Sequence, residues 1–136
     1  MASNIGVFAS QISGHLVVNP PVSGYKVWLD ASDTTTITSS GGSVSQWTDK
    51  SANAYTFTQA TSTNQPTTGS RTINSKNVLN FDGTTDYLYS TAAISTWKFL
   101  HSSASTIFIV GNMDVTNNGG ESFISTQAGS TSRIGF

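Results

Sequence analysis

Apolar and polar residues alternate in short runs along most of this chain. Tyr25, Val27 and Leu29 occupy every second position, and aromatic residues alternate with Thr over residues 55–58. An alternation of two residues is typical of β-strands, in which successive side chains point to opposite faces of a sheet. We therefore predict a strand at each of these two places.

Turn signals separate the predicted strands. Residues 34–38 lead into the turn Ser-Gly-Gly-Ser at 40–43, and a short strand is expected over 44–47. Residues 59–76 are polar and have no apolar period, which predicts a long surface loop. The pattern contains no convincing helix, so it indicates an antiparallel β-sandwich or barrel.

The second half of the chain continues the same pattern. Leu79 and Phe81 share a face, and Asp-Gly at 82–83 predicts a hairpin turn into a strand at 87–89. The run Thr-Ile-Phe-Ile-Val at 106–110 is apolar on both faces and predicts a central strand buried on both sides. Two more strands are expected at 123–124 and 134–136. The last one stops in mid-pattern, so we expect an all-β antiparallel sandwich that is incomplete at its C-terminal end.

A stiff joint at Pro20-Pro21 separates a short N-terminal arm, 1–22, from the sandwich domain, 23–136. The arm is too short to build a core of its own, so its apolar residues must lie against its own sandwich, a sister subunit or another protein. The candidate docking residues are Phe8, Ile12, Leu16 and Val18.

Composition narrows the class of protein. Charged residues make up only 10% of the chain, the net charge is −1, and aromatic residues reach 10%. Disordered chains usually combine low hydrophobicity with high net charge, so a folded β domain with a Ser- and Thr-rich surface is favoured. The six basic residues are scattered, which argues against a nucleic-acid partner. No apolar run is long enough to insert into a membrane, and the N-terminus has no signal-peptide pattern.

Four segments, taken in order, carry a family resemblance. They are VWLDASD at 27–33, VSQWTDKSAN at 44–53, NQP at 64–66 and VLNFDGTTDYL at 78–88. Their order and spacing resemble the laminin-G-like (concanavalin-like) jelly-roll domains of phages and bacteria. The resemblance implies a jelly-roll sandwich with a binding function. Ala52 departs from the pattern, because the family often has Gly there.

The arm carries a second resemblance. Residues 6–16, GVFASQISGHL, are similar to N-terminal segments of bacteriophage virion structural proteins. This resemblance implies a virion protein, either a tail-fibre-like appendage or a capsid decoration, that is attached to other virion proteins through its arm. Homo-oligomers, including trimers, are common among phage appendages. Two alternatives stay open: a carbohydrate-binding module of a secreted bacterial protein, and an inert capsid cement protein.

The residues for catalysis are missing from the pattern. Glycosidases use two facing carboxyl groups, whereas Glu121 is the single glutamate and has no acidic residue two positions away. His15 and His101 lie in no nucleophile motif, and the chain has no cysteine. We therefore expect binding and not catalysis.

Metal binding is a separate hypothesis, since laminin-G-like domains often hold Ca²⁺ through oxygen ligands. The candidates are Asp82 and Asp86 in the predicted hairpin loop, with Asp30, Asp33, Asp49 and Asp114 as further partners. The alternative is structural, because Asp before Gly often caps its own turn.

Sugar binding is the third hypothesis, and it depends on exposed aromatic rings and planar polar side chains. Candidates for a host-surface glycan are Tyr87, Tyr89, Trp97 and Asn53. Aromatic residues of a sandwich are more often part of the core, as we expect for Trp28 and Trp47. Tyr87 and Tyr89 flank Leu88 and should point to the opposite face from it.

Overall fold

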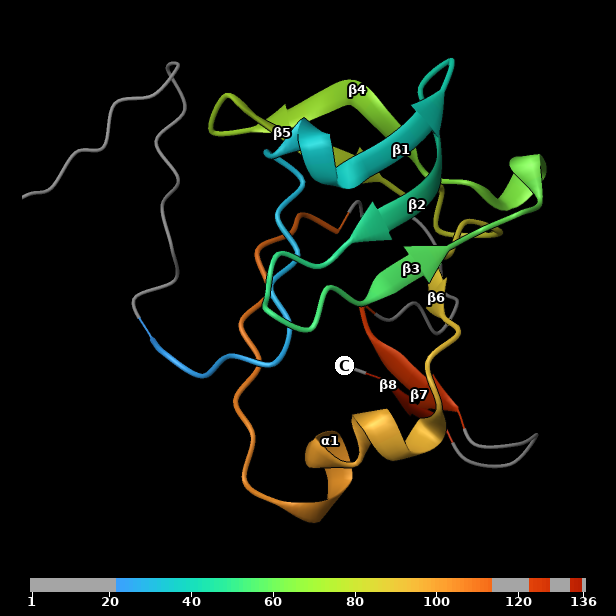
Figure 1. Cartoon of the computed structure of the whole chain (residues 1–136). Coiled ribbons are helices and arrows are strands. Elements are labelled where there is room, and N and C mark those ends of the chain that lie inside the picture. Colours follow the sequence, from blue (N-terminus) through green and yellow to red (C-terminus); the bar gives the residue numbers. More distant parts are fainter. Residues whose placement is uncertain (1–21, 114–122, 128–132, 136) are drawn as a thin grey trace, which may run out of the picture.

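The computed structural model describes residues 22–113, 123–127 and 133–135. The predicted docking residues of the arm therefore lie outside the described part of the chain, as does Asp114. Within the described part, strands dominate and helices are short, which agrees with an all-β class. Figure 1 shows one twisted sheet above a small helical segment.

The sheet begins with a tight hairpin. After the 3₁₀ turn η1, Thr34–Thr36, strand β1, Ile37–Ser40, pairs antiparallel with β2, Ser43–Thr48. Gly41 and Gly42 connect them with φ angles of 57° and 88°. Two positive φ angles are what a two-residue hairpin turn of the right twist requires, and glycine adopts them at little cost. The predicted turn at 40–43 is confirmed.

Four more strands complete the sheet, and all of its pairings are antiparallel. The hydrogen-bonded order is β5-β4-β2-β3-β6, with β1 also paired to β2. The added strands are β3, Thr56–Thr58; β4, Thr67–Ile73; β5, Lys76–Asn80; and β6, Tyr89–Ser90. The predicted strands at 44–47 and 55–58 are thus present, with slightly different ends.

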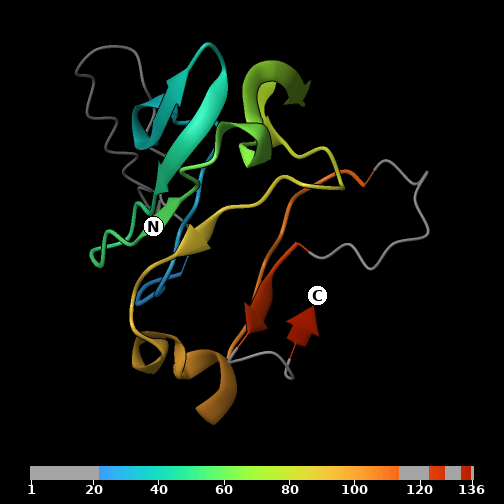
Figure 2. The ribbon, with the colours of Figure 1, turned by 90° about the vertical axis from the view of Figure 1, so that its right-hand side faces the viewer.

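Short elements complete the described structure. A 3₁₀ turn, η2, Ser62–Asn64, precedes β4, and η3, Ile94–Trp97, runs into the four-residue helix α1, Phe99–Ser102. The strands β7, Ser125–Gln127, and β8, Arg133–Gly135, form a separate antiparallel pair. The described residues thus form one six-stranded sheet and one two-stranded sheet, and Figure 2 shows the small pair beside the helical segment.

The prediction of a long loop over 59–76 is wrong for its second half. Residues 67–73 form β4, and Asn74 and Ser75 turn the chain into β5 with φ angles of 50° and 61°. Ile73 pairs with Lys76, so this is a second two-residue hairpin. The turn lacks the glycine that marks such hairpins in a sequence, and polar β4 has a register shift between Thr68 and Thr72.

The prediction of a buried central strand over 106–110 is also wrong. These residues belong to none of the described strands, and Phe108 and Val110 are 87% and 88% exposed. The expected strand over 25–29 is an irregular segment without a ladder. The turn at 82–83 does not join a hairpin, because β5 pairs with β4 while β6 pairs with β3.

The interior of the sheet region is small and partly polar. Val44 is fully buried, and Asp49, Ser51 and Gln59 are buried polar residues. A second apolar cluster lies between β3 and the helical segment. It consists of Tyr55, Phe57, Trp97 and Phe99, with ring centroids 5.1–6.1 Å apart for the pairs that involve Trp97.

We predict that Ser75→Gly stabilises the fold by roughly 0.5–1 kcal/mol, because a β-carbon is disfavoured at positive φ. Chemical denaturation followed by circular dichroism measures this change. Ser39→Gly, inside β1, is the matched control and should lower the stability. An unchanged or lower stability of Ser75→Gly would contradict the strained turn.

Candidate functional site

Alternate residues after β2 hold the irregular segment that precedes η1. The Asp49 carboxylate accepts hydrogen bonds from the backbone N–H of Trp28, at 2.6 Å, and from that of Ser51, at 2.9 Å. The Ser51 hydroxyl donates to the same carboxylate and lies 3.1 Å from the Lys26 carbonyl oxygen. Asn53 donates through its side-chain amide to that carbonyl oxygen at 2.9 Å. Asp49, Ser51 and Asn53 thus form one clamp on residues 26–28.

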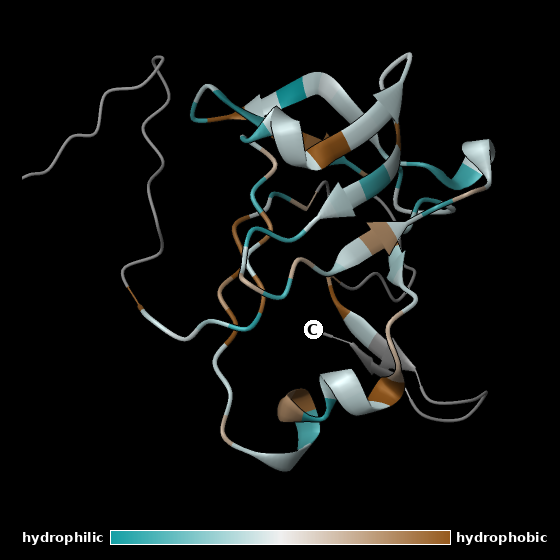
Figure 3. Cartoon of the chain, in the orientation of Figure 1, coloured by the Kyte–Doolittle hydropathy of each residue, from teal (hydrophilic) through white to brown (hydrophobic). Residues whose placement is uncertain are grey.

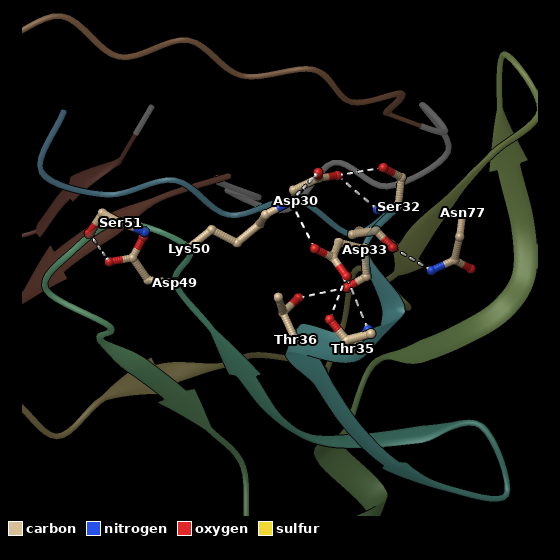
Figure 4. Close-up of polar contacts among 10 residues, drawn as sticks. Asp30, Ser32, Asp33, Thr35, Thr36, Asp49, Lys50, Ser51 and Asn77 are labelled. Carbon is tan, nitrogen blue, oxygen red and sulfur yellow. Dashed lines mark hydrogen bonds and ion pairs between the residues drawn. The ribbon is translucent and has the colours of Figure 1, made fainter. Parts of the chain in front are cut away.

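The Lys50 side chain points away from this clamp and forms an ion-pair cluster with two carboxylates, as Figure 4 shows. Its ammonium nitrogen lies 3.1 Å from the Asp30 carboxylate and 2.8 Å from that of Asp33. The same nitrogen is 4.2 Å from the centroid of the Trp28 ring. The Lys50 side chain is only 11% exposed. Sequence reasoning treated Lys50 as one scattered base, since no local pattern links residues this far apart in the chain.

The cluster shifts the acidity of its members. Lys50 and the Thr35 hydroxyl lower the pKa of Asp33 from 3.8 to about 2. Burial alone would raise the pKa of Asp30, but hydrogen bonds from Ser32 and Lys50 outweigh it and lower that pKa. Burial would lower the pKa of Lys50, and its two carboxylate partners raise it instead. All three groups are therefore charged at neutral pH, and Lys50 attracts both carboxylates.

The loop between β5 and β6 is organised by one carboxylate. Asp82 accepts hydrogen bonds from the backbone N–H groups of Thr84, Thr85 and Asp86 at 2.8–2.9 Å. The hydroxyls of Thr84 and Thr85 donate to its other oxygen at 2.8 Å. Asp86 in turn accepts from the Asp82 N–H at 3.0 Å. These backbone hydrogen bonds lower the pKa of Asp82, whereas burial raises the pKa of Asp86.

This geometry favours the structural interpretation of the loop over a Ca²⁺ site. Both carboxylate oxygens of Asp82 already accept hydrogen bonds from their own loop, so a cation would have to displace those donors. Of the further candidates, Asp30 and Asp33 pair with Lys50, and Asp49 accepts hydrogen bonds from the N–H groups of Trp28 and Ser51. Within the described ranges, no three acidic, His or Cys side chains come together in a group that could hold a metal ion.

Two tyrosines stand side by side where the loop enters β6. Tyr87 and Tyr89 are 49% and 47% exposed, and their ring centroids are 6.1 Å apart at an interplanar angle of 37°. Leu88 between them is half-buried. The pair is an open aromatic surface of two rings, which we call the tyrosine platform.

The backbone under the tyrosine platform is fixed on both sides. The Tyr87 N–H donates to the Asn64 carbonyl oxygen at 3.2 Å, and the Gln59 side-chain amide donates to the Tyr87 carbonyl oxygen at 3.3 Å. Gln59 is only 2% exposed, and its side-chain oxygen accepts from the Thr61 N–H at 2.9 Å. Gln59 was not a candidate in the sequence, because nothing in a polar stretch marks which amide becomes buried.

The other two predicted sugar contacts lie elsewhere. Trp97 is half-buried against Tyr55, Phe57 and Phe99, so its ring takes part in packing. The exposed Asn53 uses its amide in the clamp on Lys26. Of the four candidates, the structure brings together Tyr87 and Tyr89.

No family model, curated protein or solved structure matches this chain. Among the residues that the structure describes, no helix has the length and apolar character needed to cross a membrane.

We predict an acid-sensitive contribution from the Lys50 cluster. A carboxylate whose folded pKa is depressed stabilises the fold above its ordinary pKa of 3.8, and this contribution disappears as the pH falls to about 2. Asp33→Asn should therefore be less stable than the wild type at neutral pH, and the difference should close below about pH 4. Urea denaturation over a pH series measures it. A difference that stays constant down to about pH 2 would contradict this role of the Asp33 charge.

Proposed function

We propose that this chain is a non-catalytic recognition module that binds neutral glycans on the tyrosine platform. The observation that carries the proposal is the pair of adjacent, half-exposed rings of Tyr87 and Tyr89 on a fixed backbone. Adjacent tyrosine rings that are open to solvent offer a ligand both an apolar face and a hydrogen-bonding group.

Tyrosine suits this task for physical reasons. Its ring offers a flat apolar face to the C–H groups of a sugar, and its hydroxyl adds a hydrogen-bonding group. It has few rotatable bonds, so ordering it on binding costs little entropy. The contacts from Gln59 and Asn64 already hold the backbone at Tyr87, which lowers this cost further.

Charge near the tyrosine platform selects among sugars. The neighbouring loop carries Asp82 and Asp86, and residues 81–97 contain no Lys or Arg. These carboxylates would repel an anionic sugar at the platform, so neutral sugars are the better ligands. The hydroxyl groups of a neutral sugar can also donate hydrogen bonds to the exposed hydroxyl oxygens of Thr84 and Thr85, whose own protons point to Asp82.

The wider setting that we propose is a bacteriophage virion, with the arm as the attachment segment and the sheet domain facing outward. The jelly-roll sandwich belongs to the same proposal. Both rest on the sequence resemblances of residues 6–16 and 27–88. A carbohydrate-binding module of a secreted bacterial protein is the second candidate, and the tyrosine platform favours it equally.

We predict that Tyr87→Ala and Tyr89→Ala each weaken binding to a neutral oligosaccharide at least about tenfold, or 1.4 kcal/mol. Tyr87→Phe should keep most of the affinity, because the stacking face remains. A neutral-glycan array on the purified chain identifies the probe, and calorimetry with that soluble oligosaccharide measures the affinities.

Ile94→Ala is the matched control, since Ile94 is an apolar side chain, 71% exposed, outside the platform. Its affinity should equal that of the wild type. Absence of any neutral-glycan binding, or wild-type affinity in both alanine variants, would refute the proposal.

We further predict that deletion of residues 1–19 abolishes incorporation into phage particles while the sheet domain stays folded. Each apolar arm residue contributes up to roughly 1.5–3 kcal/mol if it is fully buried on a partner. Particle purification with immunodetection of the chain measures incorporation, and circular dichroism checks the fold. Normal incorporation of the deletion variant would exclude the arm as the attachment segment.

A further inference from the structure

The loop that leads into the tyrosine platform uses its hydrogen-bond donors within the protein. Residues 82–86 carry no apolar side chain and no Lys or Arg, and Figure 3 accordingly shows their trace in white and teal. Four backbone N–H groups of this loop donate to its own two carboxylates, those of Asp82 and Asp86. The N–H of Tyr87, which follows the loop, donates to the Asn64 carbonyl oxygen. A ligand at this loop therefore meets mainly acceptors.

The two threonine hydroxyls of the loop are used in the same way. Thr84 and Thr85 each donate to Oδ2 of Asp82 at 2.8 Å, while Oδ1 of that carboxylate accepts the backbone hydrogen bonds. A hydroxyl group has one proton and two lone pairs. Because the proton of each hydroxyl is held by the carboxylate, both exposed threonines offer a ligand their lone pairs alone.

This arrangement depends on the charge of Asp82. Its backbone hydrogen bonds hold the pKa of this carboxyl well below its ordinary value of 3.8, so it is ionised at neutral pH and accepts hydrogen bonds only. An amide in its place would supply donors, and the neighbouring hydroxyls would then be free to turn their protons outward. One side chain thus sets the sense in which two exposed hydroxyls bind.

The loop lies next to the tyrosine platform. Two residues of chain span at most about 7 Å, so the α-carbons of Thr85 and Tyr87 are no further apart than that. Both residues are fastened to η2. The Thr85 hydroxyl lies 3.4 Å from the Thr63 carbonyl oxygen, and the Tyr87 N–H lies 3.2 Å from the carbonyl oxygen of the next residue, Asn64. A sugar that covers the exposed Tyr87 ring is therefore within reach of the loop.

We propose that Asp82 is a positioning residue for sugar recognition, and that it makes the tyrosine platform select sugars with free hydroxyl groups. It acts through Thr84 and Thr85, whose lone pairs accept from the sugar hydroxyls. A sugar with O-methylated hydroxyls keeps an apolar ring face but has no proton to donate. A site built to hydrogen-bond a hydroxyl strongly rejects an analogue that lacks it. This role of Asp82 rests on the glycan binding proposed above.

Asp82→Asn reverses the sense of these hydrogen bonds and keeps the shape of the side chain. The amide oxygen takes the place of Oδ1, because three backbone N–H groups point there and an NH₂ group has nothing to accept them with. The amide nitrogen takes the place of Oδ2 and donates to Thr84 and Thr85. Their own protons are released, so the two threonines become donors toward a ligand.

An array that carries each neutral oligosaccharide in a free and a permethylated form supplies the probes. The wild type should bind the free form at least about tenfold more tightly, and Asp82→Asn should lower that ratio at least about tenfold. Calorimetry with one soluble pair measures both affinities. The double variant Thr84→Val, Thr85→Val removes both acceptors and keeps the Asp82 carboxylate, and it should lower the ratio as well. Thermal melts followed by circular dichroism check that each variant is folded.

Asp86→Asn is the matched control. It removes the same charge from the same loop and leaves both threonine hydroxyls bonded to Asp82, so it should keep the wild-type ratio. Equal affinity of the wild type for the two forms, a ratio that Asp82→Asn leaves unchanged, or an equal fall in both asparagine variants would overturn this role of Asp82. If Tyr87→Ala still weakens binding in that case, the proposed function stands without it. Absence of binding to every free glycan refutes both.

Discussion

The Asp49 carboxylate is the contact on which the described fold depends most. It joins the end of β2 to the backbone of Trp28, which lies 21 positions earlier, and it is almost fully buried. A buried carboxylate is tolerated only when it accepts hydrogen bonds, and the N–H groups of Trp28 and Ser51 supply them. Lys50 adds ion pairs with Asp30 and Asp33 beside it. Polar contacts thus fasten a segment that forms no ladder of its own.

The same principle recurs where the tyrosine platform is held. The buried Gln59 donates a hydrogen bond to the carbonyl group of Tyr87. Asp82 accepts hydrogen bonds from three backbone N–H groups of the loop that precedes Tyr87. Few apolar side chains are buried in the described sheet, so satisfied polar groups carry much of its specificity. The backbone at Tyr87 is thus held in place, which favours the glycan binding that we propose.

The apolar surface is distributed in an unusual way. The aromatic cluster around Trp97 covers one side of β3, yet the most apolar run of the chain, 106–110, is open to solvent. Sequence reasoning placed that run in the centre of a sheet, because a run apolar on both faces normally has two covering layers. The described structure covers Ile107 and Ile109 in part and leaves Phe108 and Val110 almost fully exposed. The run therefore has the composition of a central strand and the exposure of an edge.

Local patterns in the sequence determined the all-β class, the Gly-Gly hairpin and the strands around Val44 and Phe57, because these follow from alternation and turn chemistry between near neighbours. The exposure of Tyr87 and Tyr89 on either side of Leu88 follows from the same alternation. Only the tertiary structure decided that β5 and β6 pair with different strands, that Lys50 closes on Asp30 and Asp33, and that 106–110 stays uncovered. These outcomes depend on contacts between distant residues, whose energies no local pattern records.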